Sequence, residues 1–153
     1  MFKNTIILLD YEVNKRSMSK AKGSRTEREL LHMFWEAGHF CLRVAGSGSM
    51  PFPCPDLLVG KAGKSFAIEC KSGGQDRRYI TEQQVNELKE FAKGFGAEAW
   101  IGMRFDREGW SFLKPEDLGR NGGKNFFVSK DLCKEKGITF EELITSGNSS
   151  VSP

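Results

Sequence analysis

Two acidic residues and one lysine are spaced so that a short stretch of chain could bring them together. Side chains alternate across a β-strand, so in the segment 64–71 Glu69 and Lys71 share one face. Asp56 begins the preceding apolar segment, and a hairpin would place it near Glu69. A hard cation such as Mg²⁺ relieves the repulsion between carboxylates, and a nearby lysine can orient or deprotonate a water. The spacing predicts metal-dependent phosphodiester hydrolysis, but an ordinary Glu–Lys pair on an exposed sheet face has the same pattern.

A third carboxylate, Glu27, is expected to point toward the same region. The segment 24–27, Ser-Arg-Thr-Glu, is a capping-box pattern that predicts the start of a helix. On that helix Glu27 shares a face with Leu30, Leu31 and Phe34. A carboxylate that points inward needs a partner, such as a cation or its water. The alternative is that Glu27 only closes the capping box, whereas Glu29 is expected to face solvent.

A loop of small residues follows the predicted helix. Residues 45–50 are Ala-Gly-Ser-Gly-Ser-Met, and small residues let backbone N–H groups and hydroxyls approach a phosphate closely. Arg43 and the basic segment 71–78 would flank such a groove. Gln84, on the first turn of a later helix, could reach the same end of the sheet. The alternatives are a plain flexible loop and a solvated basic face.

The elements that must position these residues predict a single α/β domain. It would be a mixed five-stranded sheet with helices packed against it. Strands are expected at residues 40–45, 57–59, 64–71, 98–104 and 110–113. Helices are expected at about 24–37, from the N-cap Thr81 to 93, and at 139–144, with a polar loop at 72–80.

Composition restricts the function only mildly. The net charge of +3 permits a nucleic-acid partner without requiring one. The four cysteines contain no CxxC pair and are accompanied by two histidines, so free thiols are expected and a zinc site is not. No apolar run reaches the ~18 residues of a membrane span, and Ile6–Leu9 is too short for a signal-peptide core. We therefore expect no membrane partner and a cytoplasmic protein.

The chain is expected to have three parts. Residues 1–20 are polar and basic and are expected to form a mobile N-terminal extension. Residues 21–144 would form the functional domain. Residues 145–153 have the composition of a disordered tail.

Five sequence blocks resemble the archaeal Holliday-junction resolvase family Hjc, within the PD-(D/E)XK nuclease superfamily. The blocks are Lys22-Gly-Ser-Arg-Thr-Glu-Arg-Glu-Leu30, Arg43-Val-Ala-Gly-Ser-Gly-Ser49, Pro55-Asp56, Ile68-Glu-Cys-Lys71, and Gln84 followed by Glu90-Phe-Ala92. The resemblance implies a restriction-endonuclease-like sheet. It also implies a homodimer whose two sites nick opposed strands of a four-way DNA junction in recombination and repair, leaving 5′-phosphate ends.

The resemblance further implies roles for individual residues. Mg²⁺, for which Mn²⁺ is expected to substitute, would be carried by Glu27, Asp56, Glu69 and the backbone carbonyl of Cys70. Lys71 would serve the attacking water, Ser47 would lie at the cleaved strand, and Gln84 would lie near the catalytic group. The expected catalytic set is Glu27, Ser47, Asp56, Glu69, Lys71 and Gln84. The expected DNA-binding set is Lys22, Arg25, Arg28, Arg43, Ser47, Ser49, Arg77 and Arg78.

Other interpretations stay open at this point. The chain could be another nuclease of the same superfamily that acts on mismatches, flaps or restriction-type sites. It could also be a branched-DNA binding protein without catalysis, or an α/β domain unrelated to DNA. The stretch Phe140–Ile144 is a candidate docking segment for a sliding clamp.

Overall fold

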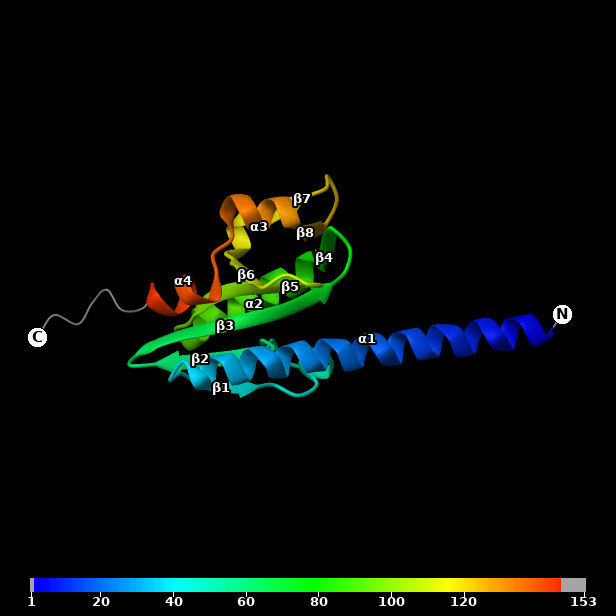
Figure 1. The fold of residues 1–153 in the computed structure, drawn as a ribbon, viewed down its shortest axis with the longest axis horizontal. Helices are drawn as coiled ribbons and strands as arrows, with labels where there is room; N and C mark the ends of the chain where they lie inside the picture. Colours follow the sequence, from blue (N-terminus) through cyan, green and yellow to red (C-terminus); the bar gives the residue numbers. More distant parts are fainter. Residues whose placement is uncertain (1, 147–153) are drawn as a thin grey trace, which may run out of the picture.

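The computed structural model describes the backbone of residues 2–146, together with the side chains of Met18 and of residues 20–146. Its longer helices and its main strands are α1 (Phe2–Glu36), β1 (Phe40–Arg43), β2 (Leu57–Lys61), β3 (Lys64–Gly73), α2 (Glu82–Phe95), β5 (Glu98–Phe105) and β6 (Trp110–Leu113). The remaining elements are β4 (Arg77–Thr81), β7 (Gly119–Arg120), β8 (Asn125–Ser129), α3 (Lys130–Lys136), α4 (Phe140–Thr145) and the 3₁₀ turns η1 (Ser47–Ser49) and η2 (Pro115–Asp117). Figure 1 shows their arrangement.

The five predicted strands form one mixed sheet in the order β1-β2-β3-β5-β6. The long strand β3 lies at its centre, antiparallel to β2 and parallel to β5. The expected five-stranded mixed sheet is therefore confirmed, with each strand within a few residues of its predicted bounds.

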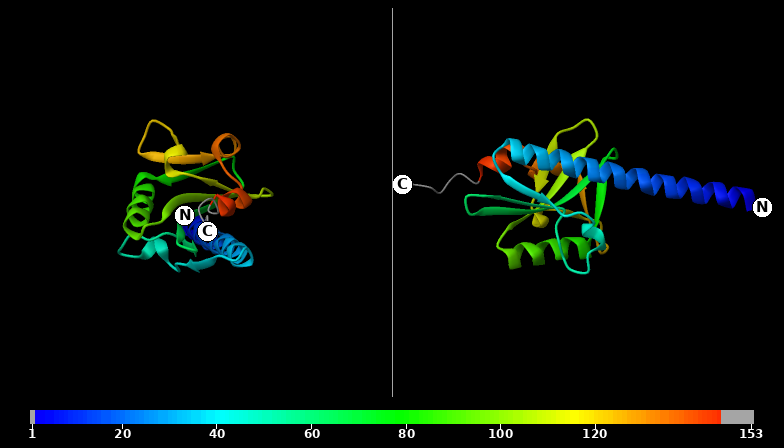
Figure 2. Two further views of the ribbon diagram at one scale, coloured as in Figure 1. Left: turned by 90° about the vertical axis from the view of Figure 1, so that its left-hand side faces the viewer. Right: turned by 90° about the horizontal axis from the view of Figure 1, so that it is seen from below.

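Helices cover both faces of this sheet, as the right-hand view of Figure 2 shows for α1 and α2. Alternation along β3 sends Phe66 and Ile68 into the core under α1, where they meet Leu30 and Phe34. The intervening Ala67 is fully buried in the second core, under α2. Because both faces are covered, β3 is rigid along most of its length, which fixes the functional side chains near its end.

A second sheet, in the order β4-β8-β7, was not predicted. Residues 72–80 were expected to form a loop, but Arg77–Thr81 form β4 and pair with Asn125–Ser129. The strand was missed because its pairing partner lies far along the chain and two arginines begin it. Ile80, Phe126 and Val128 of this sheet join the core under α2.

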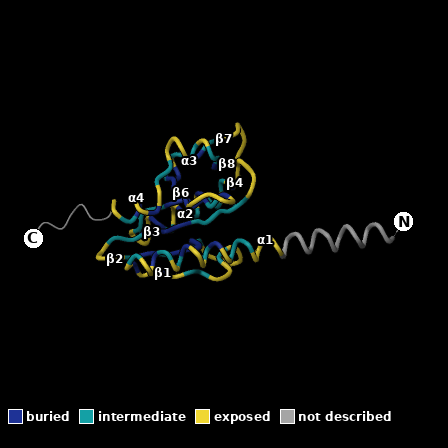
Figure 3. Tube along the Cα trace, in the orientation of Figure 1, coloured by how far each residue is buried: buried dark blue, intermediate teal, exposed yellow. Residues whose placement is uncertain are grey.

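The helix predicted to begin at Ser24 begins instead at Phe2, so that prediction is wrong. The Ser24 hydroxyl does not cap a helix; it accepts a hydrogen bond of 2.8 Å from Nη2 of Arg43. The N-terminal half of α1 projects past the sheet in Figure 1, whereas its buried side chains Thr26, Leu30 and Phe34 lie where it crosses the sheet (Figure 3). The division at residue 20 and the mobility of residues 1–20 stay predictions.

Helices α2 and α4 agree with the sequence prediction, whereas α3 was not predicted. Thr81 is the N-cap of α2 in a full capping box, and Thr139 has the same role for α4. Residues 147–153 of the predicted disordered tail lie outside the described residues. All four cysteines are free, as expected. Within residues 2–146, the structure contains no helix of the length and apolarity needed to cross a membrane.

Candidate active site

The hairpin of β2 and β3 brings Asp56 to the segment Glu69–Lys71. The backbone N–H of Asp56 donates to the carbonyl of Ile68 at 3.0 Å, which extends the hairpin by one residue beyond β2. The Asp56 carboxylate then accepts a hydrogen bond of 2.8 Å from the backbone N–H of Cys70 through its Oδ2. Asp56 is only 7% exposed. The predicted approach of Asp56 to Glu69 and Lys71 is therefore confirmed as geometry.

Glu69 and Lys71 form an ion pair of 2.7 Å, and both side chains are largely buried, at 13% and 14% exposure. Burial of the carboxylate raises the pKa of Glu69 to about 7; Lys71 opposes the shift and the charge of Asp56 adds to it. A surface Glu–Lys pair, the alternative that the spacing left open, would be exposed and would not have this environment. The pair belongs instead to a cluster of largely buried charged side chains, which also contains Asp56.

Glu27 approaches the same cluster from α1. Its Oε2 lies 3.0 Å from Nε of Arg43, and the side chains of this ion pair are 20% and 19% exposed. Burial, and next the charge of Asp56, raise the pKa of Glu27 above its usual value. The predicted inward orientation of Glu27 agrees with this placement. The capping-box alternative does not, because α1 runs through Ser24 without a break.

Ser47 also contacts Asp56. Its hydroxyl donates to Oδ1 of Asp56 at 2.6 Å, so each carboxylate oxygen of Asp56 accepts a hydrogen bond from the protein. Ser49, in the same 3₁₀ turn, is exposed. The thiol of Cys54 donates to the Ser47 carbonyl at 3.6 Å, a contact that sequence reasoning missed because nothing in the spacing singles out Cys54.

Gln84 is used differently from what was expected. Its Oε1 accepts a hydrogen bond of 3.2 Å from the backbone N–H of Thr81. The backbone N–H of Gln84 donates in turn to the Thr81 hydroxyl at 3.1 Å. The side chain thus closes the capping box of α2. The structure shows no hydrogen bond between Gln84 and the described carboxylates of the cluster.

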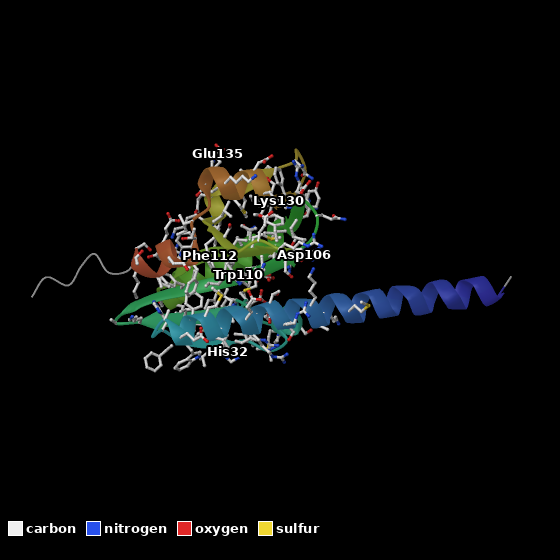
Figure 4. All side chains as sticks on the ribbon, in the orientation of Figure 1. His32, Asp106, Trp110, Phe112, Lys130 and Glu135 are labelled. Carbon is white, nitrogen blue, oxygen red and sulfur yellow. The ribbon has the colours of Figure 1, made fainter. Side chains whose placement is uncertain are left out.

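Glu29 is exposed, as expected, and its carboxylate also ties α1 to the sheet. Its Oε1 accepts hydrogen bonds from Nε of Arg104 at 2.9 Å and from Nε1 of Trp110 at 3.0 Å. Figure 4 shows Trp110 on the side of the sheet that α1 covers, and His32 on the outer side of α1. Helix periodicity gave no sign of this contact, because the partners of Glu29 lie on strands far along the chain. The contact helps to fix the helix that carries Glu27.

A cleft of about 720 Å³ opens beside the cluster, between α1 and the end of β3. Its lining includes three of the predicted DNA-binding residues, Lys22, Arg25 and Arg78, together with Cys70 and Lys71. At its edge Lys22 forms an ion pair of 2.7 Å with Asp106, a residue that the sequence did not point to. Arg28 is exposed on α1, and Arg43 is turned inward to Glu27. Arg77 lies outside the lining of this cleft, over the ring of Phe127.

The donor set of this site fits a hard divalent cation. Three carboxylates contribute to it, because Asp56 lies close enough to Glu27 and to Glu69 for its charge to raise the pKa of each. Oxygen ligands of this kind suit Mg²⁺. Within the described part of the chain, no three His, Cys, Asp or Glu side chains are already grouped for metal coordination. Lys71, Ser47 and Arg43 each engage one of the three carboxylates.

Comparisons with known proteins show the family of the chain. A profile of the family described as "Archaeal holliday junction resolvase (hjc)" matches residues 18–151. The crossover junction endodeoxyribonuclease Hjc of Archaeoglobus fulgidus is 42% identical over 113 residues, which cover 74% of this chain and 82% of that protein. The Hjc protein of Methanocaldococcus jannaschii is 32% identical over 126 residues, covering 82% of this chain and 89% of the relative. A solved structure of Archaeoglobus fulgidus Hjc superposes with a TM-score of 0.74 at 38% identity, covering 80% of this chain and 98% of that one.

Proposed function

Because this chain belongs to the archaeal Holliday junction resolvase family, we propose that Glu27, Asp56 and Glu69 form the metal-binding centre with which it cuts four-way DNA junctions. The observation that carries the assignment is the buried cluster in which Asp56 is held to the Cys70 N–H beside the Glu69–Lys71 pair. The metal would be Mg²⁺, with the Cys70 carbonyl as a further ligand and Mn²⁺ as a substitute. A bound cation would activate water and stabilise the charge that develops on the phosphate.

The residues of the chain have separable roles in this proposal. Lys71 would hold the attacking water or accept its proton, since its Nζ lies 2.7 Å from Glu69 within the cluster. Ser47 would position Asp56 through their hydrogen bond of 2.6 Å. Lys22, Arg25 and Arg78 would hold the phosphates of the strand that enters the cleft. The contacts of Gln84 support a capping role better than a catalytic one.

The direct test is cleavage of a labelled four-way junction with and without Mg²⁺, beside a linear duplex of the same sequence. Asp56→Asn and Glu69→Gln keep the size of each side chain and remove its charge. Lys71→Gln removes the group that serves the water, and general acid–base groups of this kind contribute about 100- to 10,000-fold to a rate. We expect all three variants to lose Mg²⁺-dependent cleavage and to retain junction binding. The exposed Glu141→Gln, on α4, is the matched control and should cut normally.

Cleavage by Asp56→Asn or Glu69→Gln at the wild-type rate would contradict the site. The products also carry information, since paired nicks in opposed strands that leave 5′-phosphate and 3′-hydroxyl ends can be sealed by DNA ligase. Equal cutting of the linear duplex, or preferred cutting of flaps or mismatches, would favour another nuclease of the superfamily. The chromosomal substrate would place the protein at the nucleoid.

We also propose a homodimer, because two opposed strands require two sites. One surface suits this role: β1 is an edge strand that pairs only with β2 in the described sheet, and its Phe40 and Leu42 are 69% and 66% exposed. With Trp35 and Phe95 they line an apolar pocket of about 360 Å³. Leu42→Glu should convert the dimer to a monomer in sedimentation experiments and impair paired nicking. A variant that sediments as the unaltered protein does would exclude this surface.

The structure gives little support to a sliding-clamp contact through Phe140–Ile144. Phe140 and Leu143 are 8% and 0% exposed, and the Phe140 ring packs edge-on against Phe34 with the centroids 5.0 Å apart. Both side chains belong to the core under α1. A clamp could reach them only after α4 had left the sheet.

A further inference from the structure

The second sheet carries an exposed aromatic surface on the face that does not pack on the core. Side chains alternate, so Ile80, Phe126 and Val128 turn inward while Tyr79 and Phe127 turn outward as a cross-strand pair. Tyr79 is 51% exposed. Its ring meets that of Phe127 edge-on, with the centroids 6.4 Å apart. Phe127 is half-buried, so Tyr79 is the more accessible ring of the pair.

The Phe127 ring is held in place by contacts with two neighbouring residues. Gly119 pairs with Phe127 across β7 and β8, and a Cβ at Gly119 would lie 2.2 Å from the ring, so the ring occupies the space that a side chain there would need. The guanidinium carbon of Arg77 lies 4.0 Å from the centroid of the same ring. Glycine at position 119 is therefore required for this arrangement. The side chains of Tyr79 and Arg77 are exposed to solvent on this face of the sheet.

The charge of this sheet is complementary to nucleic acid. Its three strands contain Arg77, Arg78 and Arg120 and no acidic residue. Asp76 lies just before β4, but it is 3.4 Å from Lys130, and Lys130 is in turn 3.1 Å from Glu108. Arg77 forms no ion pair with a described carboxylate, which leaves its guanidinium available to a phosphate.

Strand β4 connects this surface to the cleft. Arg78 turns to the opposite face of β4 from Tyr79 and lines the cleft together with Lys71. Neighbouring residues of one strand thus reach the cleft on one side and the aromatic surface on the other. Figure 1 shows that β4 directly follows β3, the strand that carries Glu69 and Lys71.

We infer that Tyr79, Phe127 and Arg77 bind an unpaired nucleotide of the DNA substrate, with its base stacked on the Tyr79 ring and its phosphate at Arg77. The inference rests on the proposed function, which supplies DNA as the ligand. An aromatic side chain on a sheet stacks with the face of a base, and every base offers such a face. Bases inside a duplex are already stacked on their neighbours, so the surface would select DNA whose bases are unstacked, as at a branch point.

The test measures binding of the full chain to three fluorescent DNAs without added metal: a four-way junction, a single strand of thymidines, and a linear duplex. Base–aromatic stacking is worth enough that Tyr79→Ala should weaken single-strand and junction binding by about tenfold. Duplex binding should not change. Tyr79→Phe keeps the ring and should restore affinity. Arg77→Gln should weaken binding and reduce the slope of log affinity against log salt by about 1.

A matched control is Lys61→Gln, which removes a charge at the far end of the β2–β3 hairpin, away from Asp56. It should bind all three DNAs as the unaltered chain does. Unchanged single-strand and junction affinity in Tyr79→Ala would overturn the inference, and so would an equal loss of affinity for all three DNAs. Mg²⁺-dependent cleavage of the junction by the unaltered chain tests the proposed function separately, because binding to the thymidine strand requires no catalysis.

Discussion

The carboxylate of Asp56 accepts a hydrogen bond of 2.8 Å from the backbone N–H of Cys70, the residue between Glu69 and Lys71. Cys70 is in register with Gly102 of the neighbouring strand β5, so its N–H has a fixed position. Asp56 is therefore held by the register of the sheet as well as by its own rotamer. A shift of the hairpin by one residue would turn Glu69 and Lys71 to the opposite face and remove the donor from Asp56.

The first prediction concerns pH. The folded-state pKa of Glu69 is about 7, above its usual value near 4.5, so between these values the folded chain binds a proton that the unfolded chain does not. The metal-free protein should therefore lose stability as pH rises from 4.5 to 7, by up to about 1.4 kcal/mol per pH unit. Glu27, whose pKa is also raised, contributes in the same direction.

Urea unfolding at a series of pH values measures this slope, with Glu69→Gln as the comparison. The variant should show a flatter dependence across the same window. Mg²⁺ at pH 8 should raise the melting temperature of the unaltered protein by more than that of the variant. Identical slopes in the two proteins would show that Glu69 does not titrate in this window.

The second prediction separates Ser47 from Ser49. Ser47→Ala removes the donor that lies 2.6 Å from Oδ1 of Asp56, whereas the exposed Ser49→Ala removes no hydrogen bond to the described carboxylates. Loss of an outer-shell partner costs about 10- to 100-fold in metal affinity. Ser47→Ala should therefore need about tenfold more Mg²⁺ for half-maximal junction cleavage, and Ser49→Ala should need no more than the unaltered chain. A loss of the maximal rate without a change in the Mg²⁺ requirement would assign Ser47 to the DNA instead.

The third prediction tests the ion pair of Glu27 and Arg43, whose atoms are 3.0 Å apart. Arg43→Gln leaves a largely buried carboxylate without its partner and should reduce the free energy of unfolding by about 1–3 kcal/mol. Glu27→Gln in the same chain should recover much of that loss, because the uncompensated charge is then gone. The double-mutant cycle from urea unfolding gives the coupling energy directly. Additive effects of the two substitutions would exclude a coupled pair.

The fourth prediction uses two glycines with opposite surroundings. Gly23 lies inside α1 and a Cβ there would meet no heavy atom within 4 Å, so Gly23→Ala should stabilise the protein by about 0.5–1 kcal/mol. A Cβ at Gly102 would lie 3.2 Å from both Ile68 and Phe112, inside the core. Gly102→Ala should therefore be neutral or destabilising. Thermal unfolding compares the two, and destabilisation by Gly23→Ala would show that α1 is not continuous there in solution.

Sequence periodicity was sufficient for the parts of the site that lie on regular elements. Alternation along β3 placed Glu69 and Lys71 on one face, and helical spacing turned Glu27 inward. Periodicity could not show that Ser24 is used by Arg43, because that contact joins segments on separate elements. For the same reason it missed the pairing of β4 with β8 and the contact of Glu29 with Arg104 and Trp110.

Gln84 shows a different limit of sequence reasoning. Its position on the first turn of α2 was predicted correctly, but first-turn position suits both a cap and a site residue. Only the hydrogen bonds to Thr81 distinguish the two uses. Local spacing thus identifies which residues can lie together, and long-range contacts decide which of them do.

The length of the unbroken helix α1 can be compared with the helical repeat of DNA. At about 1.5 Å of rise per residue, the backbone from Phe2 to Glu27 measures about 38 Å. That length equals about 11 base pairs of B-form DNA, close to one full turn of the duplex. A duplex arm laid along α1 would therefore present the same groove at the far end of the helix and at the carboxylate of Glu27.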